Sequence, residues 1–170
     1  MAKLALVTGA SGGIGQSICE KLAQSGFDLL LHYNTNEKAA VSLSERLSNT
    51  YHIQTEIIQS DLSDPGGQSY RGLVTDMTDE EVHEMVQLHV TSPFTLTRNV
   101  LPAMIRRKAG AIVAITSIWG ETGASCEVLY SMTKGAQHSF VKALAKELAP
   151  SGIRVNAVSP GADKTNMMSG

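Results

Sequence analysis

Short apolar runs and amphipathic stripes alternate along most of the chain. Apolar runs of about four to eight residues are typical of strands buried in a parallel sheet, whereas apolar residues three and four positions apart are typical of helices. The runs predict strands at Lys3–Val7, Asp28–Tyr33, Gln54–Gln59, Ala111–Thr116 and Arg154–Val158. The stripes predict helices at Gly13–Ser25, Glu37–Ser48, 79–107 and Val128–Leu148. This order predicts an α/β fold, a doubly wound parallel sheet in a single domain spanning residues 1–170.

Residues with known effects at helix ends support these boundaries. Asn36 precedes the second helix and can serve as its N-cap. Thr78 and Glu81 have the spacing of a capping box at the start of the third helix. Pro93 and Pro102 lie inside that third helix and should kink or interrupt it, because a proline has no N–H to donate.

One segment, between Asp61 and Thr78, lacks the alternation. Two parallel strands need a crossover of about a dozen or more residues between them. The segment contains neither a helical stripe nor a buried-strand run, and the Pro-Gly-Gly at residues 65–67 breaks the pattern further. We therefore expect the fold to be incomplete near residues 64–69.

Composition is that of a soluble globular protein. The 170 residues are 42% hydrophobic and 18% charged with a net charge of −2, which suits one domain with a sizeable core. The chain has no basic stripe for nucleic acid and no apolar stretch near the roughly 20 residues that span a bilayer. Cys19 and Cys126 provide no disulfide framework, and the first residues are typical of a strand rather than a signal peptide. We expect a cytoplasmic protein that binds neither nucleic acid nor membrane and has no metal site.

A glycine-rich turn follows the first predicted strand. Gly9, Gly13 and Gly15 have the spacing Gly-x-x-x-Gly-x-Gly, and a helical stripe follows them. A strand, a glycine turn and a helix in this order direct backbone N–H groups at a phosphate. The spacing differs from Gly-x-Gly-x-x-Gly, and the Gly-Lys-Ser/Thr of a P-loop does not follow. The turn predicts a Rossmann-type nucleotide site, and the alternative is a turn chosen for tight packing alone.

Tyr130 and Lys134 are four residues apart in a predicted helix, and Ser117 lies upstream at the end of a predicted strand. Positions i and i+4 share a helix face, so the phenol and the ammonium should lie side by side. A nearby cation lowers the pKa of a tyrosine from about 10 toward neutral pH, which would tune Tyr130 for proton transfer. The alternative is a solvated helix face, with the Ser117 hydroxyl satisfying backbone groups.

Together these motifs resemble the short-chain dehydrogenase/reductase family over nearly the whole chain. Residues 8–15, Thr-Gly-Ala-Ser-Gly-Gly-Ile-Gly, resemble its cofactor turn, and Ser117, Tyr130 and Lys134 resemble its catalytic set. The cofactor contacts that the resemblance implies are Gly9, Ser11, Gly12, Gly13, Ile14, Gly15, Asp61, Leu62, Tyr130, Lys134, Pro160, Gly161 and Thr165. Of these, Asp61 and Leu62 would contact the adenine, and the last three would hold the nicotinamide amide.

The motifs are most similar to those of the 3-oxoacyl-acyl-carrier-protein reductases. This similarity implies NADPH-dependent reduction of a small-molecule or carrier-bound ketone, a 3-oxoacyl thioester, to a secondary alcohol in fatty acid biosynthesis. It also implies a homotetramer or homodimer built on helices 79–107 and 128–148. Tyr130 would protonate the ketone oxygen, Ser117 would orient it, and Lys134 would lower the Tyr130 pKa and hold the nicotinamide ribose. Residues 117–161 also resemble the elongation factor P 5-aminopentanone reductases of bacilli, so a modified lysine on that protein is the alternative substrate.

The end of the second predicted strand bears on the choice of cofactor. An acidic residue there would bind a ribose 2′-OH and repel a 2′-phosphate. Residues 32–36 read His-Tyr-Asn-Thr-Asn, with no carboxylate before Glu37, which favours NADP(H). Asn34 and Thr35 are the candidates for the phosphate contact, and a plain turn is the alternative.

Four residues are expected near the reacting centre: Trp119, Glu121, Cys126 and Glu127. An anionic phosphopantetheine arm usually binds basic residues, whereas the two carboxylates would suit a cationic amine. The alternative is that both glutamates are solvated charges at the rim, as surface carboxylates usually are.

Two histidines lie in the predicted helices. His89 takes the place where many relatives have an asparagine that supports a proton-relay water, and an imidazole can also donate and accept. A packed or interfacial histidine is the alternative. His138, four residues beyond Lys134, is expected at a subunit interface rather than in catalysis.

The resemblance also implies which parts are absent. A helix and the central fourth strand with its Asn-Ala-Gly motif are missing, as are the substrate lid and final strand after Gly170. Either the protein is longer than these residues, or it truly lacks them and is a non-catalytic nucleotide-binding remnant. We favour the first, because loss of a central strand leaves buried backbone groups unpaired at about 1–3 kcal/mol each. Consecutive Cα atoms within Asp64–Ser69 are then expected to be further apart than about 3.8 Å.

Overall fold

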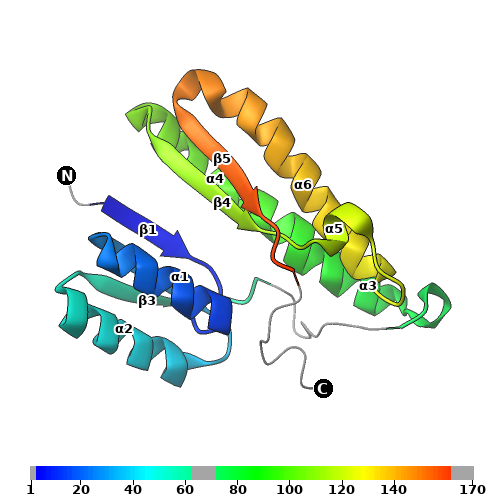
Figure 1. The fold of residues 1–170 in the computed structure, drawn as a ribbon, viewed down its shortest axis with the longest axis horizontal. Coiled ribbons are helices and arrows are strands. Elements are labelled where there is room, and N and C mark those ends of the chain that lie inside the picture. Colours follow the sequence, from blue (N-terminus) through cyan, green and yellow to red (C-terminus); the bar gives the residue numbers. More distant parts are fainter. Residues whose placement is uncertain (1–2, 63–71, 162–170) are drawn as a thin grey trace. The chain divides into compact units, whose positions relative to one another are not determined.

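The computed structural model describes residues 3–62 and 72–161, which divide into two compact units, one ending at Asp61 and one beginning at Leu62. The first unit contains β1 (Lys3–Val7), α1 (Gly13–Gln24), β2 (Phe27–Tyr33), α2 (Glu37–Tyr51) and β3 (Thr55–Gln59). The second contains η1 (Val74–Asp76), α3 (Asp79–Val86), the π-helix η2 (Gln87–Thr91), α4 (Ser92–Arg107), β4 (Gly110–Ile115), α5 (Trp119–Thr122), α6 (Val128–Leu148), η3 (Ala149–Ser151) and β5 (Ile153–Val158) (Figure 1). That the two units form a single domain stays a prediction.

The first unit is a three-stranded parallel sheet, ordered β1-β2-β3, with α1 and α2 packed on it (Figure 1). Alternate residues of a strand face opposite sides of the sheet. One face of the sheet forms the core with the two helices through Val7, Leu29, Leu31, Cys19, Ala23, Leu43 and Leu47. On the opposite face, Leu4 of β1 is 70% exposed. The carboxyl ends of the three parallel strands lie at one edge, where the glycine turn begins.

The second unit pairs β4 with β5 in parallel, from Gly110↔Ile153 to Ile115↔Val158. Its core joins the sheet to α4 and α6 through Val141, Leu144, Leu148, Ile153, Val155, Leu101, Met104 and Ile112. Val113, which alternates with the core residues of β4, is 56% exposed. Figure 1 shows α6 running alongside β5, and the loop after β4 leads directly to α5.

The helix predicted over 79–107 is divided in the structure. Thr78 and Glu81 form the predicted capping box at its start. The α3 helix then gives way to the π-helix η2, and α4 begins with Pro93 in its first turn. A proline N lacks a hydrogen, so the α-helical pattern is interrupted just before it. The expected interruption at Pro102 does not occur. The helix α4 continues through Pro102 to Arg107.

The described strands form two separate sheets. Among the described residues, β1 pairs only with β2, and β4 pairs only with β5. This is the arrangement expected when a central strand is missing. The chain break predicted within 64–69 and the nicotinamide contact predicted at Thr165 both lie outside the described residues.

Two predicted absences concern membranes and metals. Among residues 3–62 and 72–161, no helix is both long and apolar enough to cross a bilayer. In the same part of the chain, no group of three or more His, Cys, Asp or Glu side chains is placed to hold a metal ion.

Candidate active site

Backbone conformation explains Gly9 in the glycine turn of the first unit, and close packing explains Gly15. Gly9 has φ +63°, where a side chain would be strained. A Cβ on Gly15 would lie 2.1 Å from Gly9 O, so α1 packs directly against the turn. A Cβ on Gly13 would meet nothing within 4 Å. Gly12 is the N-cap of α1 and provides no side-chain cap. Packing alone therefore explains Gly15 but not Gly13, and the open N-terminus of α1 fits a phosphate.

His32 holds this turn in place, a role that sequence reasoning missed. Gly9 N–H donates to His32 Nδ1 at 3.2 Å, and the other ring nitrogen, Nε2, lies 2.8 Å from Ser60 O. Because Nδ1 accepts, the ring is neutral with its proton on Nε2, which donates to Ser60. Ala10 N–H donates to the His32 carbonyl at 2.9 Å. The signal in the sequence was a histidine directly after three leucines near the end of β2.

The residues predicted to choose the cofactor lie at the carboxyl ends of β2 and β3. Asn34 Nδ2 donates to Asp61 Oδ1 at 3.0 Å. The structure thus brings together the candidate phosphate contact and the candidate adenine contact. Thr35 is exposed beside them. The Asn34 amide is already held by a carboxylate, which leaves Thr35 as the more accessible of the two candidates.

The predicted catalytic set meets in the second unit. Ser117 is buried just after β4, and its hydroxyl is close enough to Tyr130, on the first turn of α6, to lower the pKa of the phenol. Lys134 lies one turn further along α6 and is buried, with Nζ 5.4 Å from the centre of the Tyr130 ring. Lys134 Nζ also donates to Ile115 O at 3.2 Å, which ties α6 to the end of β4. The alternative of a solvated helix face therefore does not hold for Lys134.

The prediction that the Tyr130 pKa lies below its ordinary value, toward neutral pH, is wrong for this structure. Burial raises the pKa of Tyr130 above its ordinary value, the hydrogen bond from Ser117 opposes that rise, and the charge of Glu127 adds to it. Burial also lowers the pKa of Lys134 to about 8. The cost of removing both groups from water outweighs their proximity. Tyr130 is therefore protonated at neutral pH, which is the form that can donate a proton.

The buried ammonium gives the folded state a pH dependence. The pKa of Lys134 falls from 10.5 to about 8 on folding. Between these values the unfolded chain binds more protons than the folded protein does. The free energy of unfolding therefore decreases as the pH falls from 10.5 to about 8. Between about pH 7.5 and about pH 9.5, the free energy of unfolding should rise by about 2 kcal/mol relative to Lys134→Met. Urea denaturation of both proteins measures this, and a difference that is independent of pH would contradict it.

His89 lies in η2, beside the catalytic tyrosine. Its ring meets the Tyr130 ring edge-on, with centroids 5.6 Å apart. Burial, followed by the charge of Lys134, lowers the pKa of His89 to about 4, so the ring is neutral at pH 7. Its backbone carbonyl accepts a hydrogen bond from Gln137 Nε2 at 2.6 Å. The ring packing suits the alternative of a packed histidine, and a relay through His89 stays a prediction.

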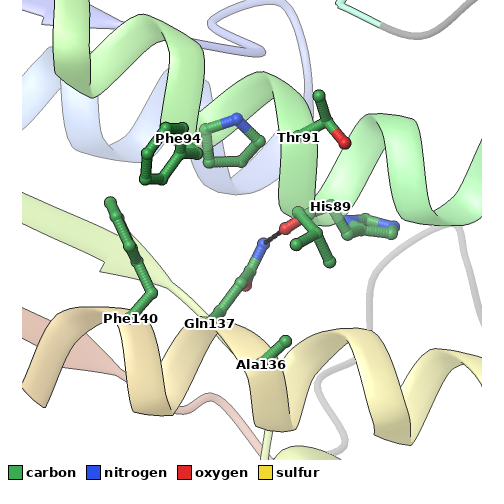
Figure 2. A pocket seen from close by; sticks show the side chains of 8 residues that line it. His89, Thr91, Phe94, Ala136, Gln137 and Phe140 are labelled. Carbon is green, nitrogen blue, oxygen red and sulfur yellow. Dashed lines mark hydrogen bonds between the residues drawn. The ribbon is translucent and has the colours of Figure 1, made fainter. Parts of the chain in front are cut away.

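A pocket of about 260 Å³ lies between η2, the start of α4 and α6. Its lining consists of His89, Val90, Thr91, Pro93, Phe94, Ala136, Gln137 and Phe140. Figure 2 shows the Gln137 side chain extending from α6 toward the carbonyl of His89. Sequence reasoning missed Gln137, although it is a polar residue on the stripe of α6 that also includes Val141 and Leu144.

The four residues expected near the reacting centre have different surroundings in the structure. Glu121 accepts from Ser159 Oγ at 2.8 Å, and its Oε1 lies 3.7 Å from His138 Nε2. These contacts engage one carboxylate oxygen of Glu121, while its side chain is 57% exposed. Glu127 precedes α6, and its charge acts on Tyr130. Trp119 begins α5, two residues after Ser117, and its backbone N–H donates to Ser117 Oγ at 3.2 Å. Exposed Cys126 lies in the connection to α6 and has φ +61°.

His138 contacts the Ser117 loop, and its expected place at a subunit interface stays a prediction. Its side chain is 13% exposed, and Nε2 lies 3.3 Å from Ser117 O. A Cβ on Gly120 would come within 2.8 Å of the His138 ring, so α5 and α6 pack closely here. The buried contact with the catalytic loop accounts for a histidine at this position.

The remaining cofactor candidates are divided between the two units. Pro160 O accepts from Ile118 N–H at 3.2 Å, which joins the end of β5 to the Ser117 loop, and Gly161 follows it. Leu62 O accepts from Ser92 Oγ at the start of α4. Ser11 and Ile14 belong to the turn and first turn of α1, where Ser11 O accepts from Gln16 Nε2 at 2.9 Å.

Comparison with known proteins gives consistent matches along the chain. The model of the short chain dehydrogenase family matches residues 3–69 and 65–170. An uncharacterized oxidoreductase of Bacillus subtilis, YmfI, is 62% identical over 188 residues, which cover 99% of this chain and 78% of that protein. A 3-oxoacyl-[acyl-carrier-protein] reductase of Aquifex aeolicus is 32% identical, covering 97% of this chain and 75% of that protein.

Solved structures agree with these matches. A short-chain dehydrogenase from Sphingobium yanoikuyae in complex with NADPH has a TM-score of 0.91 and 28% identity, covering 99% of this chain and 74% of that one. An acetoin dehydrogenase from Salmonella typhimurium has a TM-score of 0.91 and 26% identity, covering 98% and 78%. These likenesses confirm the predicted Rossmann-type α/β fold. The Bacillus alignment, at 188 residues, is longer than this chain of 170, so that relative has residues that are missing here.

Proposed function

The chain belongs to the short-chain dehydrogenase family of oxidoreductases, and from that premise we propose that it reduces a ketone to a secondary alcohol with NADPH. The observation that carries the proposal is the position of Lys134, which is buried with Nζ 5.4 Å from the centre of the Tyr130 ring, together with buried Ser117, which lowers the pKa of the same phenol. A protonated phenol beside a fixed hydroxyl can stabilise the charge that develops on a ketone oxygen.

NADPH supplies a hydride to the carbonyl carbon when it is bound. Ser117 donates a hydrogen bond to the ketone oxygen and orients it. Tyr130 transfers its phenolic proton to that oxygen, which completes the alcohol and leaves a phenolate. The ammonium of Lys134 stabilises this phenolate until solvent returns the proton. Hydride and proton together supply the two electrons and two hydrogens of the reduction.

Two observations support NADP(H) as the cofactor. The end of β2 has no carboxylate before Glu37, and the similar protein from Sphingobium yanoikuyae is an NADPH complex. The turn Gly9–Gly15 would receive the pyrophosphate, with Thr35 and Asn34 toward the 2′-phosphate. Lys134 would hold the nicotinamide ribose, and Pro160 and Gly161 would border the nicotinamide.

The first candidate substrate is a 3-oxoacyl thioester on a carrier, as in fatty acid biosynthesis. The similar reductase of Aquifex aeolicus is named for this substrate. The second candidate is a ketone with a cationic amine, such as a 5-aminopentanone-modified lysine of elongation factor P. The charge of Glu127 acting on Tyr130 favours it, because a cation would be attracted to the reacting centre.

We expect faster turnover of an acetoacetyl thioester than of a keto-amine of similar length. Steady-state rates of NADPH oxidation with each substrate measure the preference. Glu127→Gln is the matched variant, because it removes the charge and keeps the shape. If the keto-amine is reduced faster, and Glu127→Gln abolishes this preference, the second candidate is favoured. Equal rates on both substrates would show that the charge of Glu127 does not select the substrate.

The intact mass of the purified protein separates an enzyme from a non-catalytic remnant. The 170 residues have a mass of 18.1 kDa. We expect a clearly larger mass by mass spectrometry, because relatives have residues that are missing here. A mass of 18.1 kDa, together with no thermal shift in NADPH, would favour the remnant; a competent site should gain about 2.7 kcal/mol at 100 times the Kd.

A homotetramer or homodimer built on α4 and α6 and a cytoplasmic location belong to the same proposal. Phe94 on α4 is 52% exposed beside the pocket between the two helices. An apolar surface of this kind is typical of subunit contacts.

A further inference from the structure

Lys134 is a buried ammonium held by neutral groups. Its Nζ donates to Ile115 O at 3.2 Å and to Gln137 Oε1 at 3.3 Å. A buried charge is costly unless its hydrogen bonds are satisfied. Burial already lowers its pKa to about 8, so each acceptor affects how much of the charge remains at neutral pH.

The other end of the Gln137 amide binds the π-helix. Its Nε2 donates to His89 O at 2.6 Å (Figure 2). In an α-helix, this carbonyl would accept from the N–H of residue 93, but residue 93 is proline and has none. The sequence of the helix therefore removes the α-helical donor for His89 O, and Gln137 provides a donor from α6.

Few side chains could make this link. The ammonium can only donate and the carbonyl can only accept, so the connecting side chain needs an acceptor at one end and a donor at the other. An amide has both, and the two partners fix its orientation. Gln137 is also one turn from Lys134, where i and i+3 side chains meet. Gln137 is buried, which protects both bonds from water.

We infer that Gln137 is a positioning residue for the reduction, because its amide links Lys134 to the carbonyl of His89 and so holds the ammonium beside Tyr130. The inference rests on the proposed function, in which Lys134 acts on Tyr130. The titratable groups described around Lys134 are Tyr130 on α6 and His89 on η2. Glu127 acts on Tyr130, and Glu121 lies against His138.

The test measures the pKa of Lys134 directly. Protein labelled with 13C at lysine Cε is titrated by NMR without NADPH or ketone, and Lys134→Met identifies the signal. Gln137→Leu removes the acceptor and should shift the Lys134 pKa below about 8, whereas Gln137→Glu adds a carboxylate and should shift it upward. Gln24→Leu at the far end of α1 removes an exposed glutamine and is the control.

The kinetic arm uses the same variants. Gln137→Leu should lower kcat for ketone reduction by about tenfold, since hydrogen bonds to charged groups are strong, while KM changes less. The alkaline limb of the pH profile should move with the Lys134 pKa, down in Gln137→Leu and up in Gln137→Glu. If both variants fold and both keep the wild-type Lys134 pKa and the wild-type pH profile, the inference is overturned. If the wild type reduces no ketone, the proposed function fails while the NMR titration still decides the link.

Discussion

Tyr130→Phe should reduce the rate of ketone reduction by about 10²- to 10⁴-fold, the range that a general acid contributes. The variant keeps the ring that meets His89 and loses only the phenolic hydroxyl, whose pKa Ser117 affects. The proton for the ketone oxygen would then have no donor, although hydride delivery and the cofactor contacts of the glycine turn remain. NADPH affinity, measured by fluorescence, should therefore be nearly unchanged.

Tyr51→Phe is the matched control for this loss of a phenol. Tyr51 lies at the end of α2 and donates to Glu20 on α1. Its variant should retain full turnover. Turnover retained in Tyr130→Phe would refute the catalytic role of Tyr130, and lost turnover together with lost NADPH binding would indicate structural damage instead.

Gly15→Ala should lower the free energy of unfolding by about 3 kcal/mol or more, the upper end of overpacking effects. The added Cβ would lie 2.1 Å from Gly9 O and 2.9 Å from Ala10 Cα, both backbone atoms that cannot rotate away. Helix α1 would have to move from the turn, and the phosphate site would be lost with it. Urea denaturation and NADPH titration of the same sample measure both effects.

Gly13→Ala separates packing from ligand binding at the same turn. Its Cβ would meet nothing within 4 Å, so stability should change by at most about 1 kcal/mol in the favourable direction. We nevertheless expect weaker NADPH binding, because a methyl group would stand where the backbone should approach the pyrophosphate. Unchanged NADPH affinity in Gly13→Ala would mean that the turn exists for packing alone, and unchanged stability in Gly15→Ala would contradict the packing argument.

Much of the fold could be predicted because strands and helices depend on local sequence. The predicted bounds of Lys3–Val7 are the bounds of β1, and those of Val128–Leu148 are the bounds of α6. The helix predicted over 79–107 was the exception. Its two prolines have the same local chemistry, yet η2 precedes Pro93 whereas α4 continues through Pro102. At the first of these positions, Gln137 on α6 donates to the carbonyl of His89.

The candidate site shows the same division. The spacing of Tyr130 and Lys134 placed them on one helix face, but it could not show that burial raises the Tyr130 pKa. The same limit applied to His138, whose contact with the Ser117 loop the spacing could not show. His32 and Gln137 were missed because their partners lie in other elements.

The sequence by itself determined the order of strands and helices, the glycines of the turn, and the spacing of Tyr130 and Lys134. These features follow from backbone geometry and side-chain periodicity over a few residues, so a local pattern is sufficient. Only the tertiary structure decided which groups are desolvated and which atoms they bind. The link from Lys134 through Gln137 to His89 joins α6 to η2, which are far apart in the chain. The charge of Lys134 depends on how deeply the packed elements bury it. Desolvation and long-range hydrogen bonds arise only when the elements pack, and they set the proton chemistry of this site.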